Sequence, residues 1–320
     1  MQAINVEGGK LVLSDAPEPE CGPGEVRIAV AASAINRADL VQASGGYPPP
    51  PGASPILGLE CSGTVIEVGE GVTRVSQGDA VCALLAGGGY AEQVVVPAGQ
   101  VLPVPDGIDL IDAAALPEVF ATAYLNLYME ARLSTRETVV VHAGASGVGT
   151  AAIQMLKQSN NPVFVTAGSP EKIARCVAMG ADQGFDRHAG SFKDAVSQWQ
   201  GDGVDVILDP VGAQYLEDNL SVLKLNGRLV LIGLMGGAAA QVNLGILMMK
   251  RVRLIGSTLR ARPVAQKSQV MDGLLRDVWP AIERGDISPV VDARFALREA
   301  QLAHDLVATN DTFGKVLLAV

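Results

Sequence analysis

The chain has 320 residues, of which 48% are hydrophobic and 18% are charged, so we expect a globular protein with two domains and not one small core. No uninterrupted run of about 18 apolar residues occurs, which argues against a membrane span. The net charge of −10 argues against nucleic acid as a general partner, because polyphosphate would be repelled, and an anionic cofactor would need a local basic pocket.

The N-terminal sequence MQAINVEGGK has neither the basic nor the apolar region of a secretory signal, so we expect a cytoplasmic protein. The four cysteines, Cys21, Cys61, Cys82 and Cys176, include no pair with the close spacing of a metal or redox site. A structural zinc needs four closely spaced Cys or His ligands, and the chain has only three histidines. We therefore expect buried or half-buried free thiols and no metal site.

Residues 1 to 118 are predicted to form a small, irregular, β-rich domain. Short β-branched runs at Val26–Ser33, Gly63–Val68 and Tyr90–Val96 are separated by Gly and Pro clusters. The proline run 48–51 is interpreted as a rigid connector inside this domain, because strand-like sequence surrounds it. A ligand for a proline-binding module is the alternative interpretation of that run.

From about residue 119 the pattern changes to apolar strands that alternate with helices, which predicts a doubly wound parallel sheet of six strands. The strands are expected at Val139–His142, Val163–Ala167, Gln183–Asp186, Val204–Asp209, Arg228–Gly233 and Val252–Gly256. Helices are expected directly after the first strand, at Pro170–Met179 and at Ala213–Leu223.

From Pro263 onward a long helical stretch leads to strand-like sequence at Val290–Val291 and Val316–Val320. We expect this tail to return to the first domain, because the parallel sheet already has its six strands. The fold class is thus α/β, with one domain formed by residues 1–118 and 262–320 and a dinucleotide-binding domain formed by residues 119–261.

The strongest local signal is a glycine-rich turn between a buried strand and an amphipathic helix. It contains Gly144, Ala145, Ser146, Gly147, Val148 and Gly149. Small residues let the backbone approach a pyrophosphate, and the helix N-terminus offers free N–H groups and a positive dipole. The strand–turn–helix context favours dinucleotide binding over a tight turn alone, with Ser146 in place of one glycine of the GxGxxG motif.

The residues after the second strand favour NADPH over NADH. An NAD site places a carboxylate there to accept the ribose hydroxyls, and this chain has Gly168 at that position. Ser169 can donate to a 2′-phosphate, while Lys172 and Arg187 can supply positive charge or, for Arg187, stack on the adenine. Glu171 is a carboxylate close to this position and argues against a 2′-phosphate, but we interpret it as stabilising the end of its helix.

The chain resembles the zinc-free quinone oxidoreductases of the medium-chain dehydrogenase/reductase superfamily, and among these the p53-inducible group more than the zeta-crystallin type. The resemblance covers the whole chain and is carried by residues 34–63, 142–154, 165–174, 204–212, 231–237 and 254–262. Zinc-dependent relatives carry a Cys where this chain has Asn36 and a His where it has Leu59, and their four-cysteine lobe would lie near Gly87. Both zinc sites are therefore expected to be missing.

The resemblance implies a GroES-like first domain, a Rossmann second domain, substrate bound in the cleft between them, and a homodimer or dimer of dimers. A pairing of sheets at the edge near Val252–Leu259 would make the dimer, and an exposed apolar edge strand is an independent reason to expect it. Beyond the turn itself, the resemblance implies cofactor contacts from Asn36, Thr122, Gly168, Ser169, Lys172, Gly212, Leu234, Thr258, Leu259 and Arg260. Gly233 and Met235 are expected to join them, and Arg187 stands where the family commonly has a tyrosine.

Asn36 and Tyr47 are the candidate catalytic residues. Asn36 can hydrogen-bond a ribose hydroxyl or a substrate carbonyl, or it can cap a loop. Tyr47 offers a flat ring and a phenol that can stack on a quinone or donate a proton, and packing against the prolines is its structural alternative. Asp39 is expected to cap the helix 38–43. Among the histidines, His142 is expected to be structural, and residues 188 and 304 to lie on the surface.

Three functions follow from these residues, in order of preference. The first is NADPH-dependent reduction of small soluble quinones, in which the protein orients the reactants and excludes water. The second is reduction of the activated C=C bond of an enal, enone or enoyl thioester, since Tyr47 lies eleven residues after Asn36, as does the proton-donating tyrosine of the superfamily's enoyl-thioester reductases. The third is nucleotide binding without turnover, in a redox sensor or structural protein.

Overall fold

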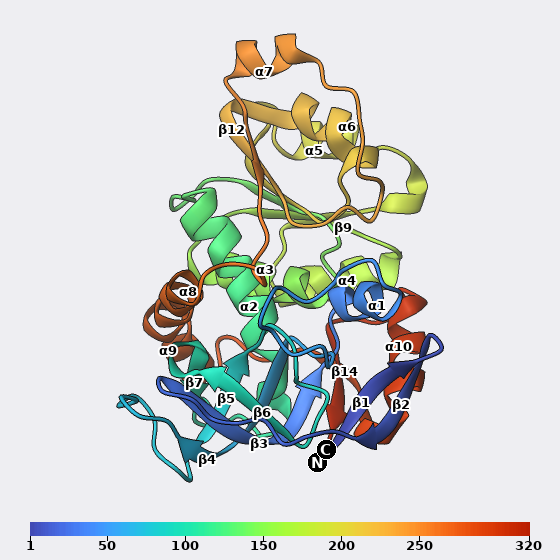
Figure 1. Ribbon diagram of the computed structural model, residues 1–320. Helices are drawn as coiled ribbons and strands as arrows, with labels where there is room; N and C mark the ends of the chain where they lie inside the picture. The colour runs from blue at the N-terminus through green and yellow to red at the C-terminus, as the bar shows by residue number, and fades with distance from the viewer. The chain divides into compact units, whose positions relative to one another are not determined.

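The computed structural model covers residues 1–320 and divides into two units, each with its own large sheet. Unit 1 is Met1–Ala121 together with Leu259–Val320, and unit 2 is Thr122–Thr258. The sequence predicts these divisions between residues 118 and 119 and between residues 261 and 262. Unit 2 is thus one continuous segment inserted into unit 1 (Figure 1).

Unit 2 contains the expected six-stranded parallel sheet. In their order across the sheet the strands are β10 (Gln183–Asp186), β9 (Val163–Ala167), β8 (Val139–Val141), β11 (Val204–Asp209), β12 (Leu223–Leu231) and β13 (Arg253–Gly256). The chain order reverses between β8 and β11, and in open parallel sheets ligands bind at the carboxyl ends of the strands at such a point.

Helices cover both faces of this sheet (Figure 1). On one face, α3 (Gly147–Gln158) and α4 (Pro170–Met179) contact each other and strands β8 and β9. On the other, α5 (Lys193–Trp199), α6 (Leu216–Val222) and α7 (Leu244–Lys250) close a core built on apolar strand residues such as Val140, Phe164 and Ile207. Large apolar side chains on both faces of a strand produce the unbroken hydrophobic runs from which the sheet is predicted.

Local differences from the predicted elements have simple causes. The helix expected at Ala213–Leu223 is a 3₁₀ turn, Ala213–Tyr215, followed by α6, because Leu223 already begins strand β12. Helix α4 has the predicted bounds, with Ser169 as its N-cap and Pro170 at its first position. A π-helix at Leu125–Glu130 and a 3₁₀ turn at Arg187–Ala189 complete unit 2.

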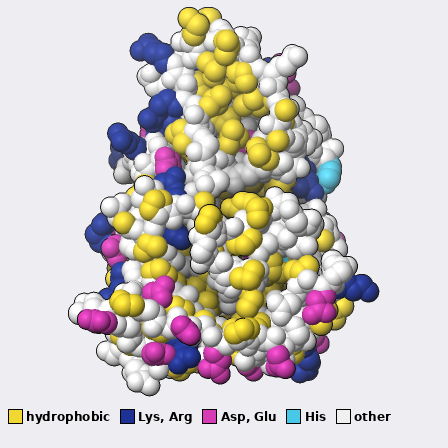
Figure 2. Space-filling model, in the orientation of Figure 1, with side chains coloured by type: hydrophobic (Ala, Val, Ile, Leu, Met, Phe, Trp, Pro, Cys, Tyr) yellow, Lys and Arg dark blue, Asp and Glu magenta, His cyan; other side chains and the backbone are white.

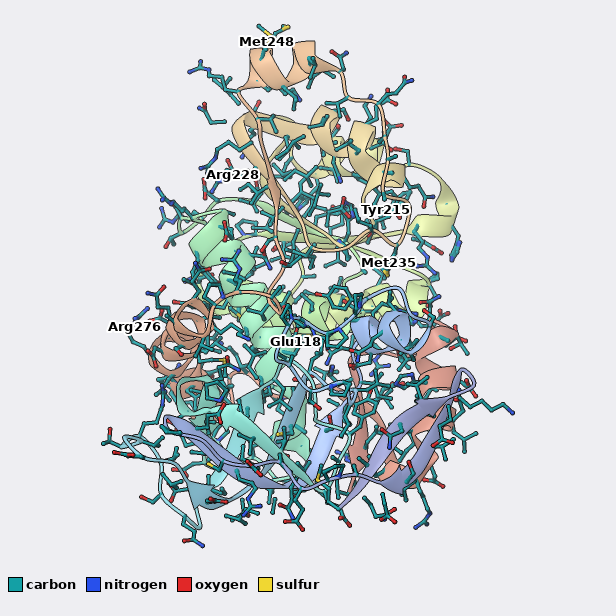
Figure 3. The ribbon with its side chains drawn as sticks, viewed as in Figure 1. Glu118, Tyr215, Arg228, Met235, Met248 and Arg276 are labelled. Carbon is teal, nitrogen blue, oxygen red and sulfur yellow. The ribbon has the colours of Figure 1, made fainter.

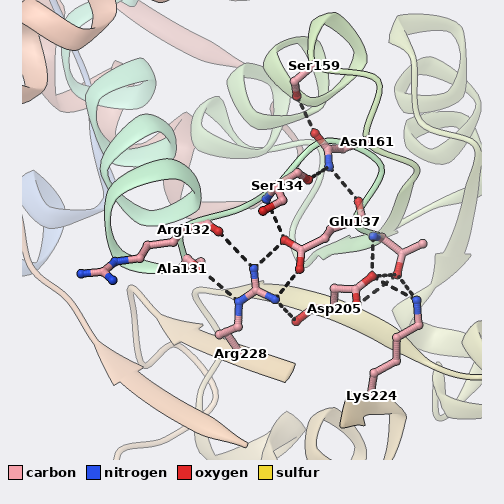
Figure 4. Close-up of polar contacts among 10 residues, drawn as sticks. Ala131, Arg132, Ser134, Glu137, Ser159, Asn161, Asp205, Lys224 and Arg228 are labelled. Carbon is pink, nitrogen blue, oxygen red and sulfur yellow. Dashed lines mark hydrogen bonds and ion pairs between the residues drawn. The ribbon is translucent and has the colours of Figure 1, made fainter. Parts of the chain in front are cut away.

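Ion pairs hold the amino ends of the strands of unit 2 together (Figure 4). Both terminal nitrogens of Arg228 donate to the carboxylate of Glu137, at 2.8 and 2.6 Å, and Arg228 Nε donates to the carbonyl oxygen of Ala131 at 2.9 Å. Beside them, Asp205 accepts from the backbone N–H of Thr138 at 2.8 Å and from Lys224 at 3.0 Å. Each of these charged groups therefore has a partner of opposite charge within unit 2.

Unit 1 is built on a sheet that joins the N-terminal residues to the returning tail. Its path is β14 (Val291–Ala296), β15 (Lys315–Ala319), β3 (Glu25–Ala34), β4 (Glu60–Val68), β5 (Ala80–Leu84) and β7 (Val101–Pro103), with β6 (Gln93–Pro97) also paired to β3. Strand β15 pairs antiparallel with β3, so the predicted return of the tail is confirmed. A separate hairpin is formed by β1 (Gln2–Glu7) and β2 (Lys10–Asp15).

The helices of unit 1 lie in the connections and in the tail. They are α1 (Arg37–Ala43), α8 (Val264–Asp277), α9 (Trp279–Glu283) and α10 (Ala300–Ala308), with 3₁₀ turns at Ala98–Gln100, Asp112–Ala115 and Leu297–Glu299. Helix α2 (Pro117–Tyr124) crosses the division between the units. The expectation of free thiols is confirmed, since Cys21 is half-buried and the other three are buried. None of the helices is long and apolar enough to cross a membrane.

Candidate functional site

The glycine-rich turn follows β8 as predicted. Ser146 is the N-cap of α3, and its Oγ accepts a hydrogen bond from the backbone N–H of Gly149 at 3.0 Å. The hydroxyl that replaces a glycine of the motif therefore helps to start the helix. The amides of Gly147 and Val148 begin the same helix, where the first N–H groups have no intrahelical acceptor. An anion can bind to such groups without further adjustment.

Two glycines of the turn are required by close packing. A Cβ at Gly149 would lie 2.5 Å from the carbonyl oxygen of Ala143, and a Cβ at Gly144 would lie 2.8 Å from Cβ of Val165 in β9. Real side chains essentially never approach so closely, so the helix could not keep this position with alanine at residue 149. Ala143 itself has a φ of 53°, which is uncommon for a residue other than glycine.

The end of β9 has the features from which the sequence predicts a 2′-phosphate pocket. The Arg187 guanidinium lies against Gly168, where an added Cβ would be 3.4 Å from Nη2. Ser169 Oγ accepts from the backbone N–H of Lys172 at 3.3 Å. Hydrogen bonds from its own backbone N–H and from Ser169 lower the pKa of Glu171, which supports the helix-end role expected for that carboxylate.

A buried polar chain runs beneath this edge of the sheet. Asn219 donates through Nδ2 to Asp209 at 2.9 Å, so its Oδ1 accepts from Nε2 of His142 at 2.7 Å. Nδ1 of His142 is then the acceptor for the Thr166 hydroxyl at 3.0 Å. Burial lowers the pKa of His142, so the imidazole is neutral and carries its proton on Nε2. The structural role expected for His142 is thus to connect the ends of β8, β9 and β11.

The loops that follow β11 and β12 are hydrogen-bonded to each other. Gly236 donates its backbone N–H to the carbonyl of Val211 at 2.7 Å, and Ala213 donates to that of Gly237 at 3.0 Å. Gly212 has a φ of 84°, and a Cβ there would lie 2.9 Å from the Gly237 oxygen. A Cβ at Gly233 would lie 2.8 Å from the carbonyl oxygen of Pro210.

In the loop that follows β12, the side chains of two predicted cofactor contacts remain on the surface. Leu234 and Met235 are 55% and 53% exposed (Figure 3 labels Met235). Apolar side chains of this exposure are suited to packing on a flat ring.

In unit 1, Asn36 lies in a buried charged cluster with Glu60 and Lys315. Asn36 Nδ2 donates to Glu60 at 2.9 Å and to the carbonyl of Ala34 at 3.2 Å, and its Oδ1 accepts from Lys315 Nζ at 2.8 Å. Lys315 also contacts Glu60 at 2.7 Å and the carbonyl of Ile35 at 2.6 Å. Both amide hydrogens of Asn36 are therefore used, whereas Oδ1 keeps one lone pair.

A second buried cluster corrects the expectation for His304. This histidine is expected on the surface, but it is 5% exposed and its Nε2 lies 3.1 Å from the hydroxyl of Tyr90. Tyr90 donates to Asp39 at 3.2 Å, and Asp39 accepts from the backbone N–H groups of Asn36 and Gly58. Helix α10 was not predicted, and its inner face carries His304 into the core. The exposed position expected for His188 is confirmed.

The same cluster explains the helix-capping role expected for Asp39. Its side chain accepts from the Asn36 backbone N–H at 2.8 Å, at the start of α1. The helix begins at Arg37, one residue before the expected start. Burial raises the pKa of Asp39 to about 6 and lowers that of His304 to about 4.

Tyr47 is half-buried at the start of the proline run and pairs with Arg260. The guanidinium carbon of Arg260 is 5.2 Å from the centre of the Tyr47 ring, and Arg260 Nη1 donates to the Tyr47 carbonyl at 3.4 Å. Burial raises the pKa of the Tyr47 phenol, although the nearby Arg260 charge opposes this effect. The phenol is therefore protonated at neutral pH and can act as a donor.

Comparison with known proteins gives two family matches. Residues 22–106 match the GroES-like domain of alcohol dehydrogenases, and residues 147–276 match the zinc-binding dehydrogenase family. The chain is 35% identical over 320 residues to a quinone oxidoreductase of Pseudomonas aeruginosa, with 97% of this chain and 96% of the relative covered. It is 34% identical over 307 residues to quinone oxidoreductase-like protein 2 of Rattus norvegicus, with 95% and 87% covered.

The chain belongs to the quinone oxidoreductase family of the medium-chain dehydrogenase/reductase superfamily. The quinone oxidoreductase of Escherichia coli, whose structure is complexed with NADPH, superposes with a TM-score of 0.87 at 27% identity and covers 100% of this chain and 99% of its own. The predicted combination of a GroES-like unit with a Rossmann-like unit is thus confirmed.

The positions of the zinc ligands in other members of the superfamily hold different groups in this family member. No group of three or more His, Cys, Asp or Glu side chains is arranged to hold a metal ion. Asn36 instead contacts an ammonium group, that of Lys315. Leu59 is buried, and the residues near Gly87 pack tightly on the 54–58 loop, where a Cβ at Gly87 would lie 2.4 Å from the Ser54 oxygen.

Sequence reasoning missed Lys315, Glu60 and Asn219 as parts of these clusters. Lys315 lies 279 residues from Asn36, and Asn219 lies 77 residues from His142, so neither spacing suggests contact. One signal was available, because a Lys at the start of an otherwise apolar strand is rarely buried without a carboxylate partner.

Proposed function

We propose that this family member is an NADPH-dependent reductase of small quinones that works without zinc. The observation that carries the proposal is the glycine-rich turn of unit 2, in a chain that is similar over almost its whole length to quinone oxidoreductases. The zinc-independent form of the proposal rests on Asn36 and Leu59, which stand where zinc-dependent relatives carry a Cys and a His.

The residues of unit 2 fit a dinucleotide. Small residues at positions 144 and 149 place the backbone and the start of α3 where a pyrophosphate can bind to the N–H groups of Gly147 and Val148. When bound, NADPH supplies a hydride. The other proposed contacts are Thr122, Ala145, Ser146, Gly212, Gly233, Leu234, Met235, Thr258 and Leu259.

The proposed choice of NADPH rests on the end of β9. A carboxylate at Gly168 would select for the ribose hydroxyls of NADH, whereas the Arg187 guanidinium lies against this glycine. With Ser169 and Lys172 on the next turn, this arrangement favours a phosphate with two negative charges.

In unit 1 we propose different roles for Tyr47 and Asn36. A quinone that gains one hydride becomes an anion, and one proton completes the hydroquinone; the protonated phenol of Tyr47 is the proposed donor. Asn36 has no free amide hydrogen for a substrate carbonyl, but the remaining lone pair on Oδ1 can accept from a ribose hydroxyl. We therefore propose cofactor positioning for Asn36.

The acceptor class is tested by a comparison of NADPH oxidation with 1,2-naphthoquinone and with crotonyl-CoA. Rapid oxidation with the quinone alone is the expected result. The reverse preference would overturn the proposal and support reduction of an activated C=C bond with Tyr47 as proton donor. In that case Tyr47→Phe should reduce activity on enoyl substrates far more than on quinones. Tight NADPH binding with neither substrate turned over would indicate a non-catalytic nucleotide-binding protein.

We further propose a homodimer, or a dimer of dimers, formed through the edge of the unit 2 sheet. Strand β13 pairs only with β12, and Leu254 on it is 38% exposed. The nearby α7 exposes Met248 and Met249 by 78% and 82%. Figure 2 shows that apolar side chains gather on the surface of unit 2. A cytoplasmic location is proposed because a reducing compartment fits four free thiols.

A further inference from the structure

Arg260 is a buried cation with an unused donor. Its side chain is 3% exposed, and Nε donates to the carbonyl of Ala86 at 2.8 Å while Nη1 donates to that of Tyr47 at 3.4 Å. Its Nη2 is buried and has no hydrogen-bond partner. Native proteins rarely leave a buried guanidinium nitrogen without an acceptor, so this atom calls for a ligand or another specific explanation.

The surroundings of Arg260 are aromatic and cationic. The guanidinium lies over the ring of Tyr47, at 5.2 Å from its centre. Lys267 in helix α8 is 5% exposed and donates to the carbonyl of Arg260 at 3.3 Å. A second buried cation therefore lies next to Arg260. The carboxylate of Glu118 is near enough to influence both cations, and with it the three groups carry a net charge of +1.

We propose that Arg260 and Tyr47 form a subsite for a flat aromatic substrate that bears an anionic or carbonyl oxygen. The ring of the substrate would lie beside Tyr47, and its oxygen would accept from Arg260 Nη2. The proposal rests on the proposed quinone reduction and makes its substrate class narrower: quinones with an acidic or hydroxyl group next to the carbonyl.

During quinone reduction, this subsite would stabilise the negative charge that forms on the substrate oxygen. A reduced quinone carries negative charge on oxygen before it gains its proton, and a desolvated guanidinium stabilises such an oxygen better than water does. A quinone that is already an anion gains the same contact in its ground state. The resemblance assigns Arg260 to the cofactor instead, but every contact described for its side chain is to unit 1 residues, among them the proposed proton donor.

The experiment measures binding of 1-hydroxy-2-naphthoate, an aromatic anion that cannot be reduced by hydride, and of neutral 2-naphthol by calorimetry on the full chain. The wild-type protein is expected to bind the anion at least tenfold more tightly than 2-naphthol. Arg260→Gln should remove at least tenfold of the affinity for the anion and less than threefold of that for 2-naphthol. Arg276→Gln is the matched control, because Arg276 is 69% exposed and extends from α8 into solvent (Figure 3).

An unchanged preference for the anion in Arg260→Gln would overturn the proposal. If that variant does not fold, Arg260→Lys replaces it in the test: it keeps the charge but loses the forked geometry, so the anion preference should fall at least threefold. A larger loss of NADPH affinity than of naphthoate affinity in Arg260→Gln would also overturn the proposal. It would indicate that Arg260 contacts the cofactor, as the resemblance implies.

A kinetic comparison separates this inference from the function on which it rests. KM for 2-hydroxy-1,4-naphthoquinone, an anion at neutral pH, should rise at least tenfold in Arg260→Gln, and KM for 1,4-naphthoquinone less than threefold. If the wild-type protein reduces no quinone but binds naphthoate through Arg260, the proposed function fails and the subsite stands. If both quinones are reduced and both KM values change alike, the subsite fails and the function stands.

Discussion

The strands of the parallel sheet in unit 2 have amino ends and carboxyl ends, which we call the amino edge and the carboxyl edge. These two edges are built by opposite means. At the amino edge, Arg228, Glu137, Asp205 and Lys224 form ion pairs in which the charges satisfy one another. At the carboxyl edge, glycines replace side chains, and the polar chain beneath them centres on a neutral imidazole, that of His142.

The difference supports the proposal that a charged ligand binds at the carboxyl edge. Paired charges at the amino edge fix the strands and need no further partner. At the carboxyl edge the open backbone N–H groups at the start of α3 keep their capacity for an anion, because the groups that order the strands below are uncharged or already bonded. The amino edge should therefore control stability, and the carboxyl edge NADPH binding.

The largest effect is expected from Gly149→Ala. The new Cβ would lie 2.5 Å from the Ala143 oxygen, so the start of α3 must move and its N–H groups lose their alignment. The Kd for NADPH, measured by fluorescence titration, should rise at least about 100-fold, which corresponds to about 2.7 kcal/mol. Gly201→Ala is the control, because a Cβ there meets nothing within 4 Å. An unchanged Kd would mean that this packing does not position the phosphate site.

Arg228→Met tests the opposite edge. It leaves the Glu137 carboxylate, 25% exposed, without its paired cation, so the free energy of unfolding should fall by about 2 kcal/mol, less than for a fully buried pair. Denaturant unfolding measures this loss, while the Kd for NADPH should stay within about twofold, since the variant acts at the far edge. Lys224→Met, in a more exposed pair, should cost less than about 1 kcal/mol. A large rise in Kd would contradict the division of roles.

Replacement of both Lys172 and Arg187 by Ala tests the cofactor choice at the carboxyl edge. Loss of two charged donors should raise the Kd for NADPH about 10- to 30-fold and that for NADH less than about threefold. Lys193→Ala, an exposed lysine at the start of α5, should change neither value. Equal weakening of both cofactors would show that these residues do not contact the 2′-phosphate.

The smallest effect concerns the pH dependence of the neutral imidazole. Burial lowers the pKa of His142 below its ordinary value of 6.5, so the unfolded chain binds its proton first as the pH falls. Its contribution to stability is present above pH 6.5 and is lost below, by at most about 1.4 kcal/mol per pH unit.

His142→Gln tests this contribution. The difference in unfolding free energy between wild type and His142→Gln should shrink between pH 7 and pH 5.5, as measured by urea unfolding. Exposed His188→Gln is the control. A difference that does not change with pH would show that His142 does not stay neutral.

Local periodicity and turn chemistry were sufficient to predict most of unit 2. Strands β9, β10 and β11 and helix α4 have the predicted bounds. Strands β9 and β11 are mostly apolar and buried, and α4 begins at a capping serine followed by proline. In unit 1 the short strands β5 and β7 and helix α10 were missed, because sheet pairing and burial against distant segments determine them more than local pattern does.

By itself, the sequence determined the strands of unit 2, helix α4, the glycine-rich turn and the residues from which NADPH is predicted, since each of these is a local pattern. Only the tertiary structure decided the partners of the buried polar groups. It pairs Asn36 with Lys315, His142 with Asn219, and Tyr47 with Arg260, and it places His304 in the core. The physical reason is that a buried donor or charge must find a partner, and that partner is set by the path of the chain in space.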